Sequence, residues 1–286
     1  MSYLDRINDC NHHDRTLYRD FKIAGVLAGR MRHAFADRLR VWEDVFKVGH
    51  NEVTLSAELE RDSVSVERRS ECVCTVLHEL HTEGVIDGWR DEIHKISNRW
   101  SDPPLLLVER ASMPHFGATG VAVHMNGYVR QGKELALWVA RRADTKPTAP
   151  GKLDHLVAGG QPAHLGLFEN LIKECAEEAG IARSLAKCAK STGFVSYAHD
   201  SSRGYRPEVA YTFDLELPDD FEPVNKDGEV AGFFLSPVEE VAELVRETRQ
   251  FKSNCALVIV DFLVRHGVIT AEEPEFCEIV SGLRRC

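Results

Sequence analysis

The sequence predicts an α/β (α+β) protein built from two units. Short apolar or alternating segments, typical of strands, interchange with longer segments whose apolar residues recur at helical spacing. Asp102-Pro103-Pro104 then breaks the chain, and a new strand-like run follows it. A chain of 286 residues is long enough for two modest domains. We therefore expect a smaller N-terminal α/β domain over residues 1–102 and a second domain over residues 103–286.

Composition narrows the class of protein. The chain is 43% hydrophobic and 28% charged, which is typical of a globular protein and argues against wholesale disorder. The net charge of −10 gives no basic footprint for nucleic acid. No apolar run has membrane-spanning length, and the first fifteen residues lack a signal-peptide core. We expect a cytoplasmic protein with neither nucleic-acid nor membrane partners, and either a monomer or a homodimer.

The first unit carries no recognisable chemistry of its own. Residues 4–10 suit a short helix, residues 52–59 (EVTLSAEL) alternate like a strand, and residues 61–84 become helical, with Val73, Val76, Leu77 and Leu80 at helical spacing. His78 and His81 share a face of that helix with Glu83 near its end, but without further ligands we expect an ordinary helix face. Eight cysteines are present without zinc spacing, which favours reduced thiols; Cys175 and Cys255 fall on apolar helical faces and are expected in the core.

The second unit alternates strands and helices. Its expected strands are residues 105–109, 120–129, 135–140, 193–198, 208–216 and 230–235. Its expected later helices are residues 237–246 and 254–266, and the apolar face of the last should pack on the sheet.

Residues 156–181 (LVAGGQPAHLGLFENLIKECAEEAGI) organise this unit. A short apolar strand breaks at Gly159-Gly160, a loop follows, and then a helix begins whose apolar residues Phe168, Ile172, Cys175 and Ala179 recur at helical spacing. Gly180 is placed to end that helix. The segment is therefore a strand, a tight loop and a helix.

Three glutamates occupy the opposite face of that helix. Glu174, Glu177 and Glu178 stand at i, i+3 and i+4, so their carboxylates meet, at a cost of about 0.2–0.5 kcal/mol per like-charged pair. A hard divalent cation reverses that cost, because Mg²⁺ binds carboxylate oxygens together with substrate phosphates. A solvated acidic face is the ordinary alternative. The preceding strand and glycine loop favour a metal site.

The order of these pieces resembles the Nudix hydrolase box. Gly159 takes the place of its first glycine, and the last nine residues, 173–181, align as KECAEEAGI. Leu165 stands where the family has its first Glu, and Lys173 where it has Arg. Lysine is a point charge without a planar fork, so we expect bidentate bracing of the glutamates to be lost.

The resemblance implies a Nudix α/β/α sandwich with a mixed sheet, and catalysis with Mg²⁺ (Mn²⁺ is possible). It assigns Glu174, Glu177 and Glu178 to the catalytic and metal-binding cluster, with the Gly159 carbonyl as a further ligand. Members of the family also supply an acidic residue from downstream of the box. Glu229 is our first candidate for that ligand, and Glu208 the second.

Substrate-binding residues are sought outside the box. Arg141, Arg142, Lys146 and Lys152 precede it around a Pro/Gly loop and either neutralise a diphosphate or form a solvated basic loop. Apolar ligand walls need aromatic residues, and the candidates are Trp89, Tyr205 and Phe251, each of which also suits an ordinary structural role.

A wider resemblance covers nearly the whole chain. Segments such as WRDE, RRADTKPTAPGKLDHLVAGG, RPEVAYTFDLELP and FKSNCALVIVDFLVRHG look like one Nudix subfamily, which includes the Nudix portion of fungal thiamine pyrophosphokinase-like proteins and plant plastid Nudix proteins. This implies hydrolysis of thiamine diphosphate, or its oxidised analogues, to the monophosphate and phosphate, with the N-terminal domain as a specificity element.

Three alternatives remain open. The same metal cluster would serve a pyrophosphatase for a dinucleotide or nucleotide sugar. An isomerase related to isopentenyl-diphosphate isomerase would need a reactive Cys that we cannot place. A ligand-binding module with a degenerate box gains support from Leu165 and Lys173, whereas the three intact glutamates argue against it.

Overall fold

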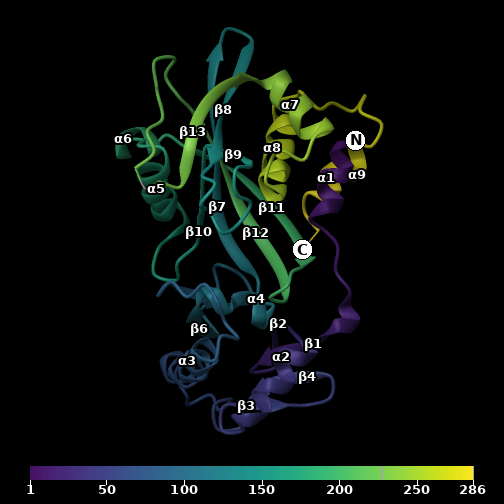
Figure 1. Cartoon of the computed structure of the whole chain (residues 1–286), viewed down its shortest axis with the longest axis vertical. Coiled ribbons are helices and arrows are strands. Elements are labelled where there is room, and N and C mark those ends of the chain that lie inside the picture. Colours follow the sequence, from purple (N-terminus) through teal and green to yellow (C-terminus); the bar gives the residue numbers. More distant parts are fainter. Residues whose placement is uncertain (227, 286) are drawn as a thin grey trace.

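The structure is a computed structural model that describes residues 1–226 and 228–285 (Figure 1). Its N-terminal part holds a four-stranded sheet in the order β2-β1-β4-β3 and a two-stranded sheet of β5 and β6. The strands are β1 (Tyr18–Ile23), β2 (Val26–Arg32), β3 (Phe46–Val48), β4 (Glu52–Leu55), β5 (Ile93–Ile96) and β6 (Leu106–Glu109). The helices of this part are α2 (His33–Arg38), α3 (Val66–Thr82) and α4 (Met113–Phe116).

The second part is built on a seven-stranded mixed sheet. The order is β11-β12-β7-β8-β13, with β10 also pairing with β7 and β9 with β8. Only the β7–β12 pair is parallel among the pairs that the described residues form in this sheet. The strands are β7 (Gly120–Gln131), β8 (Glu134–Arg142), β9 (Leu153–His155), β10 (Val157–Gly160), β11 (Lys190–Asp200), β12 (Tyr205–Glu216) and β13 (Val230–Pro237).

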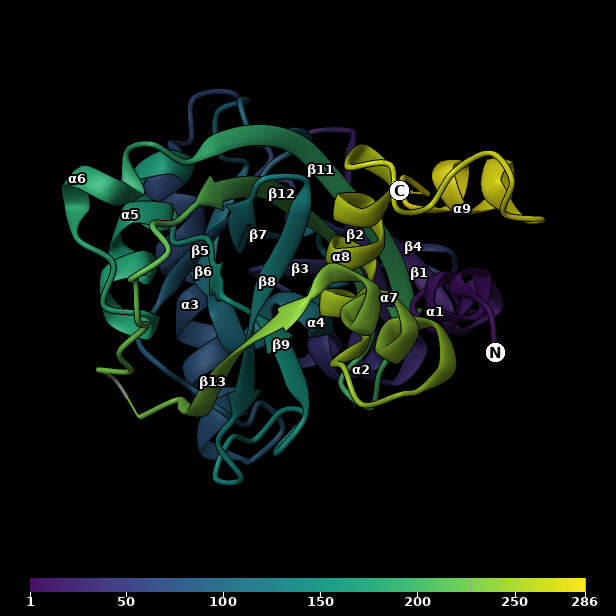
Figure 2. The same ribbon diagram turned by 90° about the horizontal axis from the view of Figure 1, so that it is seen from above.

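Helices cover both faces of this sheet (Figure 2). One face packs against α5 (Leu167–Glu178) and α6 (Arg183–Ala186), and the other against α7 (Val238–Glu247) and α8 (Ser253–Arg265). Side chains on β7 alternate between the two faces: Val123 and Met125 join the α5 side, whereas Tyr128 joins the α8 side. The expected three-layer α/β/α arrangement with a mixed sheet is confirmed.

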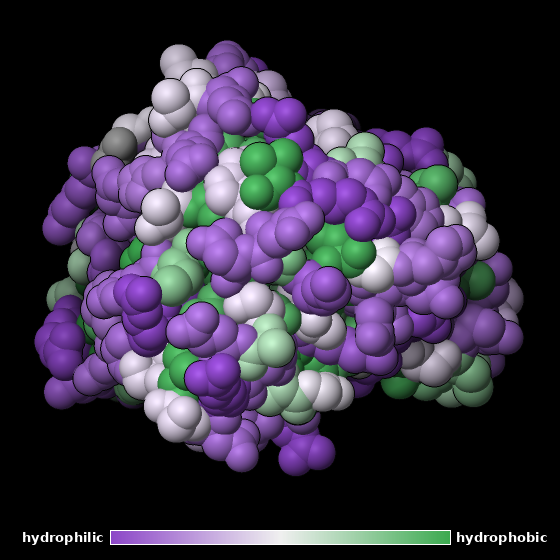
Figure 3. Space-filling model, turned by 90° about the horizontal axis from the view of Figure 1, so that it is seen from below, coloured by the Kyte–Doolittle hydropathy of each residue, from purple (hydrophilic) through white to green (hydrophobic). Residues whose placement is uncertain are grey.

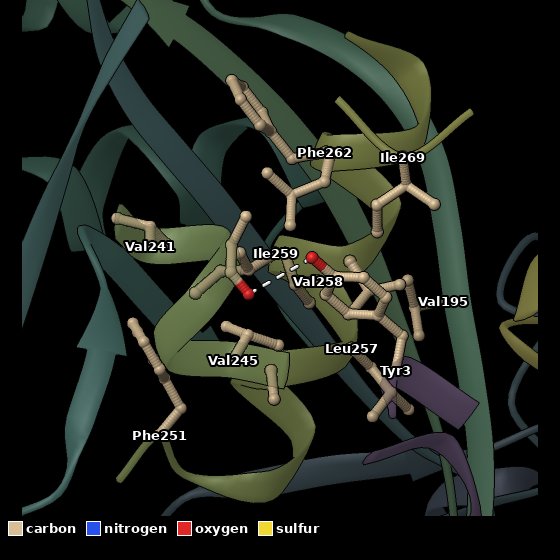
Figure 4. Packing of buried hydrophobic residues seen from close by; sticks show 14 of the residues in the cluster. Tyr3, Val195, Val241, Val245, Phe251, Leu257, Val258, Ile259, Phe262 and Ile269 are labelled. Carbon is tan, nitrogen blue, oxygen red and sulfur yellow. Dashed lines mark hydrogen bonds between the residues drawn. The ribbon is translucent and has the colours of Figure 1, made fainter. Parts of the chain in front are cut away.

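The core on the α8 side includes residues from the start of the chain (Figure 4). Tyr3 and Ile7 of α1 (Tyr3–Asp9) pack among Leu257, Val258 and other residues of α8, next to α9 (Phe276–Gly282). The Tyr3 hydroxyl donates a hydrogen bond to the carbonyl of Ala242 on α7 at 3.3 Å. The helix expected near residues 4–10 is present, but it belongs to the core of the second domain.

The N-terminal domain has a separate core that extends past residue 102. Phe21, Leu77, Leu106 and Phe116 belong to one buried cluster. The Pro103-Pro104 break lies in the turn between β5 and β6, two strands of one hairpin. The hydrophobic cores therefore divide the chain near residue 118, where α4 ends and β7 begins. Local chain-breaking residues at 102–104 mark a turn inside the domain and could not reveal which core the next strand joins.

No helix within the described residues is long and apolar enough to cross a membrane. Seen from below, the surface carries mostly polar side chains with small, separate hydrophobic patches between them (Figure 3). Each cysteine among residues 1–226 and 228–285 is free, and Cys175 and Cys255 are fully buried, as expected.

Candidate active site

Helix α5 carries the three glutamates, of which Glu177 is exposed, while Glu174 and Glu178 lie against the end of β10. Leu171, Ile172 and Cys175 are buried against the sheet. Gly180 follows the helix with a φ of +65°, a left-handed conformation that glycine adopts without strain. The expected helix and its end are thus confirmed. Phe168 differs, because its side chain is 39% exposed and contacts Phe213 only at the edge of the core.

Gly159 and Glu174 are in intimate contact. A Cβ placed on Gly159 would lie only 2.5 Å from Oε1 of Glu174 and would overlap the rest of its carboxyl group. The Glu174 side chain is only 14% exposed. Burial raises the pKa of its carboxyl group, and the nearby charge of Lys173 only partly offsets this.

Glu178 reaches back to the strand before the loop. One carboxylate oxygen, Oε2, accepts a hydrogen bond from the amide of Ala158 at 2.7 Å. Burial raises its pKa well above the ordinary value, despite that hydrogen bond, and the charges of Asp154, Glu174 and Glu229 add to the rise. Glu174 and Glu178 therefore form a buried, crowded pair of acids.

Lys173 contacts two of the box glutamates. Its Nζ lies 3.3 Å from Oε1 of Glu174 and 2.6 Å from Oε2 of Glu177. The two parallel bonds of an arginine fork are absent, as expected, but one ammonium bridges both carboxylates. Glu177 is the exposed member of the three.

Of the two downstream acids, the structure places Glu229 near the box helix. Its charge contributes to the raised pKa of Glu178. Glu229 forms an ion pair with Lys146, and although burial opposes it, the contact with Lys146 holds the Glu229 pKa below its ordinary value. Glu208 belongs elsewhere, because it accepts hydrogen bonds from Tyr197 and Arg206.

The other basic candidates have structural partners. Arg142 pairs with Asp154 at 2.9 Å and also donates to the carbonyl of Thr148, while Nζ of Lys152 donates to the carbonyl of Arg249 at 2.7 Å. Arg141 is exposed on β8. Among the residues that the structure describes, Lys146 alone of the four bonds to a candidate site carboxylate, whereas Arg142 and Lys152 hold the loop that joins β8 to β9.

The three aromatic candidates do not form a common wall. The Trp89 ring stacks on His81, with ring centroids 4.9 Å apart, and also contacts His78. Tyr205 is buried beside Tyr18, and Phe251 lies in the α8-side core, where it is 4% exposed.

The aromatic expectation was therefore wrong for Tyr205 and Phe251, whose apolar surface is used in packing. The His78–His81 face serves as a platform for Trp89, in agreement with the ordinary role expected for it.

Two groups of residues near the site were missed by the sequence analysis. The first is Arg110 with Glu92, which pair at 3.1 Å and come from the N-terminal domain. A Cβ on Gly160 would lie 3.0 Å from the guanidinium carbon of Arg110, so this arginine lies directly over the glycine loop. The charge of Glu92 also raises the pKa of Glu174. Only the paired charges of the WRDE segment hinted at this role.

The second group is a buried polar cluster under α8. His124 and His155 hydrogen bond through Nδ1 and Nε2 at 2.7 Å, and His155 Nδ1 bonds Asp154 at 2.7 Å. The sulfur of Cys255 completes a set of ligand atoms within 4.8 Å of one another. Burial lowers the pKa of His124 well below its ordinary value. No spacing rule links these residues, because β7, β9 and α8 bring them together only in the folded chain.

The donors on α5 fit a hard divalent cation. Glu174 and Glu178 offer carboxylate oxygens whose crowding and burial disfavour the charged form in the absence of a counter-charge. The Glu174 carboxylate occupies the space over Gly159 that a side chain would fill. The carboxylate therefore lies directly against the backbone of Gly159. Oxygen donors of this kind suit Mg²⁺ or Mn²⁺ better than soft metals.

Comparison with known proteins identifies the family of the chain. A family model described as a NUDIX domain matches residues 118–255, and one described as a domain of unknown function, DUF4743, matches residues 2–120. Nudix hydrolase 24, chloroplastic, of Arabidopsis thaliana is 41% identical over 99% of this chain and 77% of its own length. Nudix hydrolase 20, chloroplastic, of the same plant is 39% identical with the same coverage.

A solved structure of a MutT protein from Methanosarcina mazei Go1 is also similar, with a TM-score of 0.39, 17% identity, and coverage of 50% of this chain and 92% of that one. The full-length similarity to the two plant proteins, together with the match of the NUDIX model to the strand-loop-helix unit, settles the family. The chain belongs to the Nudix hydrolases and is a hydrolase of phosphoric anhydride bonds.

Proposed function

We propose that the protein is a Mg²⁺-dependent hydrolase of thiamine diphosphate or its oxidised analogues. Water would split the terminal P–O–P bond and give the monophosphate and phosphate. The observation that carries the proposal is the pair of acids, Glu174 and Glu178, held against Gly159 and Ala158 at the end of β10. The ion pair of Glu229 and Lys146 adds a third acid and an ammonium group. Acidic groups that hold a cation and a basic group for phosphate oxygens are what hydrolysis of a diphosphate requires.

Glu174, Glu178 and Glu229, with the carbonyl of Gly159, are the residues that would hold Mg²⁺, with Mn²⁺ as a substitute. When bound, the cation would supply charge neutralisation at the phosphoryl oxygens and a water of lowered pKa. The chain's own part is to fix these acids. Ala158 holds Glu178 through its amide, and Lys173 spans Glu174 and Glu177. A carboxylate of this group would accept the proton of the attacking water.

The choice of thiamine diphosphate is supported by the subfamily resemblance over both domains. A nucleotide substrate would use the same acids, so geometry at α5 does not separate the two. We expect the features that select between the two substrates to lie in the N-terminal domain. The subfamily shares this domain, and its Arg110 lies against Gly160 at the end of β10.

The test is hydrolysis in Mg²⁺ and in EDTA. It is followed by phosphate release for thiamine diphosphate and its oxo and oxy analogues, and by chromatography of the monophosphate products for dinucleotides and nucleotide sugars. We expect Mg²⁺-dependent turnover concentrated on the thiamine compounds. Turnover on nucleotides alone would reject the substrate, and turnover that persists in EDTA would reject the metal requirement. No turnover on any compound of the panel would favour a ligand-binding role.

The matching variant is Glu178→Gln, which keeps the size and removes the charge. We expect it to lose at least 100-fold in kcat/KM. Glu240→Gln, on the exposed face of α7, is the control. Equal rates for the wild type and Glu178→Gln would remove Glu178 from the catalytic cluster.

A further inference from the structure

We propose that the N-terminal domain supplies two arginines, Arg90 and Arg110, that bind the diphosphate group of the substrate beside the Nudix helix. The inference rests on the proposed function only in taking a small-molecule diphosphate as the ligand. It assigns substrate contacts to a domain that has no Nudix box of its own.

The first observation is the position of Arg110 over the glycine loop. A Cβ on Gly160 would lie 3.0 Å from its Cζ and 3.1 Å from Nη2. Gly160 directly follows Gly159, which lies against Glu174, so the arginine and the acid adjoin consecutive residues. The Arg110 side chain is 39% exposed, and within residues 1–226 and 228–285 its only bonded partner is Glu92, through Nη1. Its remaining N–H groups are available to a phosphate, which a guanidinium binds in bidentate fashion.

The second observation is that the buried carboxylate of Glu109 fixes the backbone of the turn that carries Arg90. Glu109 is 1% exposed, and its oxygens accept hydrogen bonds from the amides of Arg90 and Glu92, each at 3.1 Å. Between these two residues Asp91 has a φ of +57°, which is uncommon outside glycine. The Trp89 ring nitrogen donates to Asp91 at 2.8 Å. A buried anion therefore fixes a strained turn, and such strain is often kept where a side chain must be aimed.

The third observation is how this turn meets the Nudix domain. The amide of Ala163, in the loop between β10 and α5, donates to the carbonyl of Ile93 at 2.8 Å. The backbone of β5 thus fastens the loop that leads into the acidic helix.

Both arginines are positioned by the same buried carboxylate, because Glu109 bonds the backbone of the turn that carries Arg90 and directly precedes Arg110 in the chain. Arg90 is exposed, and its side chain has no bonded partner among the described residues. Its guanidinium and the unbonded N–H groups of Arg110 are therefore available to an anion from the side of the N-terminal domain.

A purely structural role is the competing explanation, in which Arg110 and Glu92 form a salt bridge within the N-terminal domain and Arg90 is solvated. The two explanations differ in what they predict for ligand binding. A salt bridge alone changes stability and leaves diphosphate affinity unaltered, whereas the proposed role changes affinity even where stability is kept.

The experiment measures binding of methylenediphosphonate, a diphosphate analogue that cannot be hydrolysed, to the full-length protein in Mg²⁺ by calorimetry. The variants are Arg90→Gln, Arg110→Gln and Arg110→Lys, and the control is Arg99→Gln, an exposed arginine of the same domain. KM and kcat are measured on the best substrate of the panel, whichever compound that is.

We expect roughly 10- to 100-fold weaker binding for Arg90→Gln and Arg110→Gln, the range for a lost hydrogen bond to a charged group, with KM rising in parallel. Arg110→Lys should recover only part of the affinity, because it restores charge without the fork. Arg99→Gln should match the wild type.

Affinities within twofold of the wild type for both glutamine variants would overturn the proposal, as would a wild type that binds no diphosphonate in Mg²⁺. If Arg110→Gln fails to fold, Arg90→Gln and Arg110→Lys carry the test. Failure of the thiamine assignment leaves this test intact, because the probe contains no thiamine.

Discussion

Gly159 and Glu174 leave no room for a side chain between them. A Cβ on Gly159 would come within 2.5 Å of Oε1 of Glu174 and would overlap its carboxyl carbon. The glycine thus gives space to one of the acids that we propose as metal ligands. Contact with the backbone, in addition to any metal-binding role, explains why no larger residue fits at position 159.

We therefore expect Gly159→Ala to displace the Glu174 carboxylate and to lower kcat/KM by at least about 100-fold, the size of effect produced by misplacing a reacting group by about 1 Å. Gly232→Ala is the control, since a Cβ there meets no atom within 4 Å. The measurement is steady-state kinetics in Mg²⁺ with melting temperatures for both variants. Activity at the wild-type level in Gly159→Ala would show that Glu174 can move without consequence.

Glu178 should destabilise the metal-free fold at neutral pH. Burial raises its pKa, so the folded protein holds the proton more tightly than the unfolded chain does. The free energy of unfolding therefore falls as the pH rises from the pKa of a glutamate in the unfolded chain, near 4.3, through the higher pKa of Glu178 in the folded protein. Glu178→Gln cannot ionise, and in EDTA it should be more stable than the wild type at pH 7.5 by roughly 1–3 kcal/mol.

Denaturation in EDTA at several pH values checks this, with Glu240→Gln as the reference. The advantage of Glu178→Gln should shrink towards acid pH. A variant that is less stable than the wild type at pH 7.5 would contradict the burial of an ionised carboxylate.

His115 should make the protein sensitive to acid. Burial lowers its pKa to about 4, and Nε2 has no hydrogen-bond partner among the described residues. The unfolded histidine takes up a proton below its ordinary pKa of about 6.5 while the folded one stays neutral. Its contribution to stability is therefore present above pH 6.5 and is lost as the pH falls through 4, by up to about 3 kcal/mol.

His115→Phe keeps the ring contact with Phe35 and removes the titration. Unfolding measured at pH 7.5 and pH 5 should show a smaller loss for this variant than for the wild type. His50→Phe, at an exposed histidine, should follow the wild type. A parallel loss in all three proteins would assign the acid sensitivity to other groups.

Tyr3 should be a strong contributor to the stability of the Nudix domain, although it lies at the other end of the chain. The side chain is 5% exposed in the α8-side core. Tyr3→Ala should cost about 3–5 kcal/mol, as for other large buried aromatic residues. Tyr3→Phe should cost about 1 kcal/mol, since only the hydrogen bond to Ala242 is lost. Urea denaturation distinguishes the two variants. A free energy of unfolding for Tyr3→Ala equal to that of the wild type would mean that the packing of α1 does not stabilise the Nudix domain.

Local patterns in the sequence predicted the parts of the site that lie on one element. Ile172, Cys175 and Ala179 are buried and Gly180 ends the helix, because helical spacing and a left-handed glycine are properties of neighbouring residues. The three-layer architecture followed from the family resemblance and is confirmed.

Contacts between elements were beyond the same reasoning. Arg142 was a candidate for binding diphosphate, yet its partner is Asp154, which strand pairing brings beside it. Trp89 was a candidate for a substrate wall, whereas its ring packs on His78 and His81. In each case a charged or aromatic residue near the box had a tertiary partner, and only the folded structure shows which residues are left free to meet a ligand.

Helix α1 packs on the Nudix domain before the chain enters the N-terminal domain, and β7 returns directly from α4. The N-terminal domain is therefore connected to the Nudix domain at both of its ends. The tip of the β11–β12 hairpin adds a further attachment, because Asp200 accepts hydrogen bonds from Tyr18 and from the amide of Asp14. A domain held in this way keeps the turn of residues 89–92 at high local concentration beside the acidic helix.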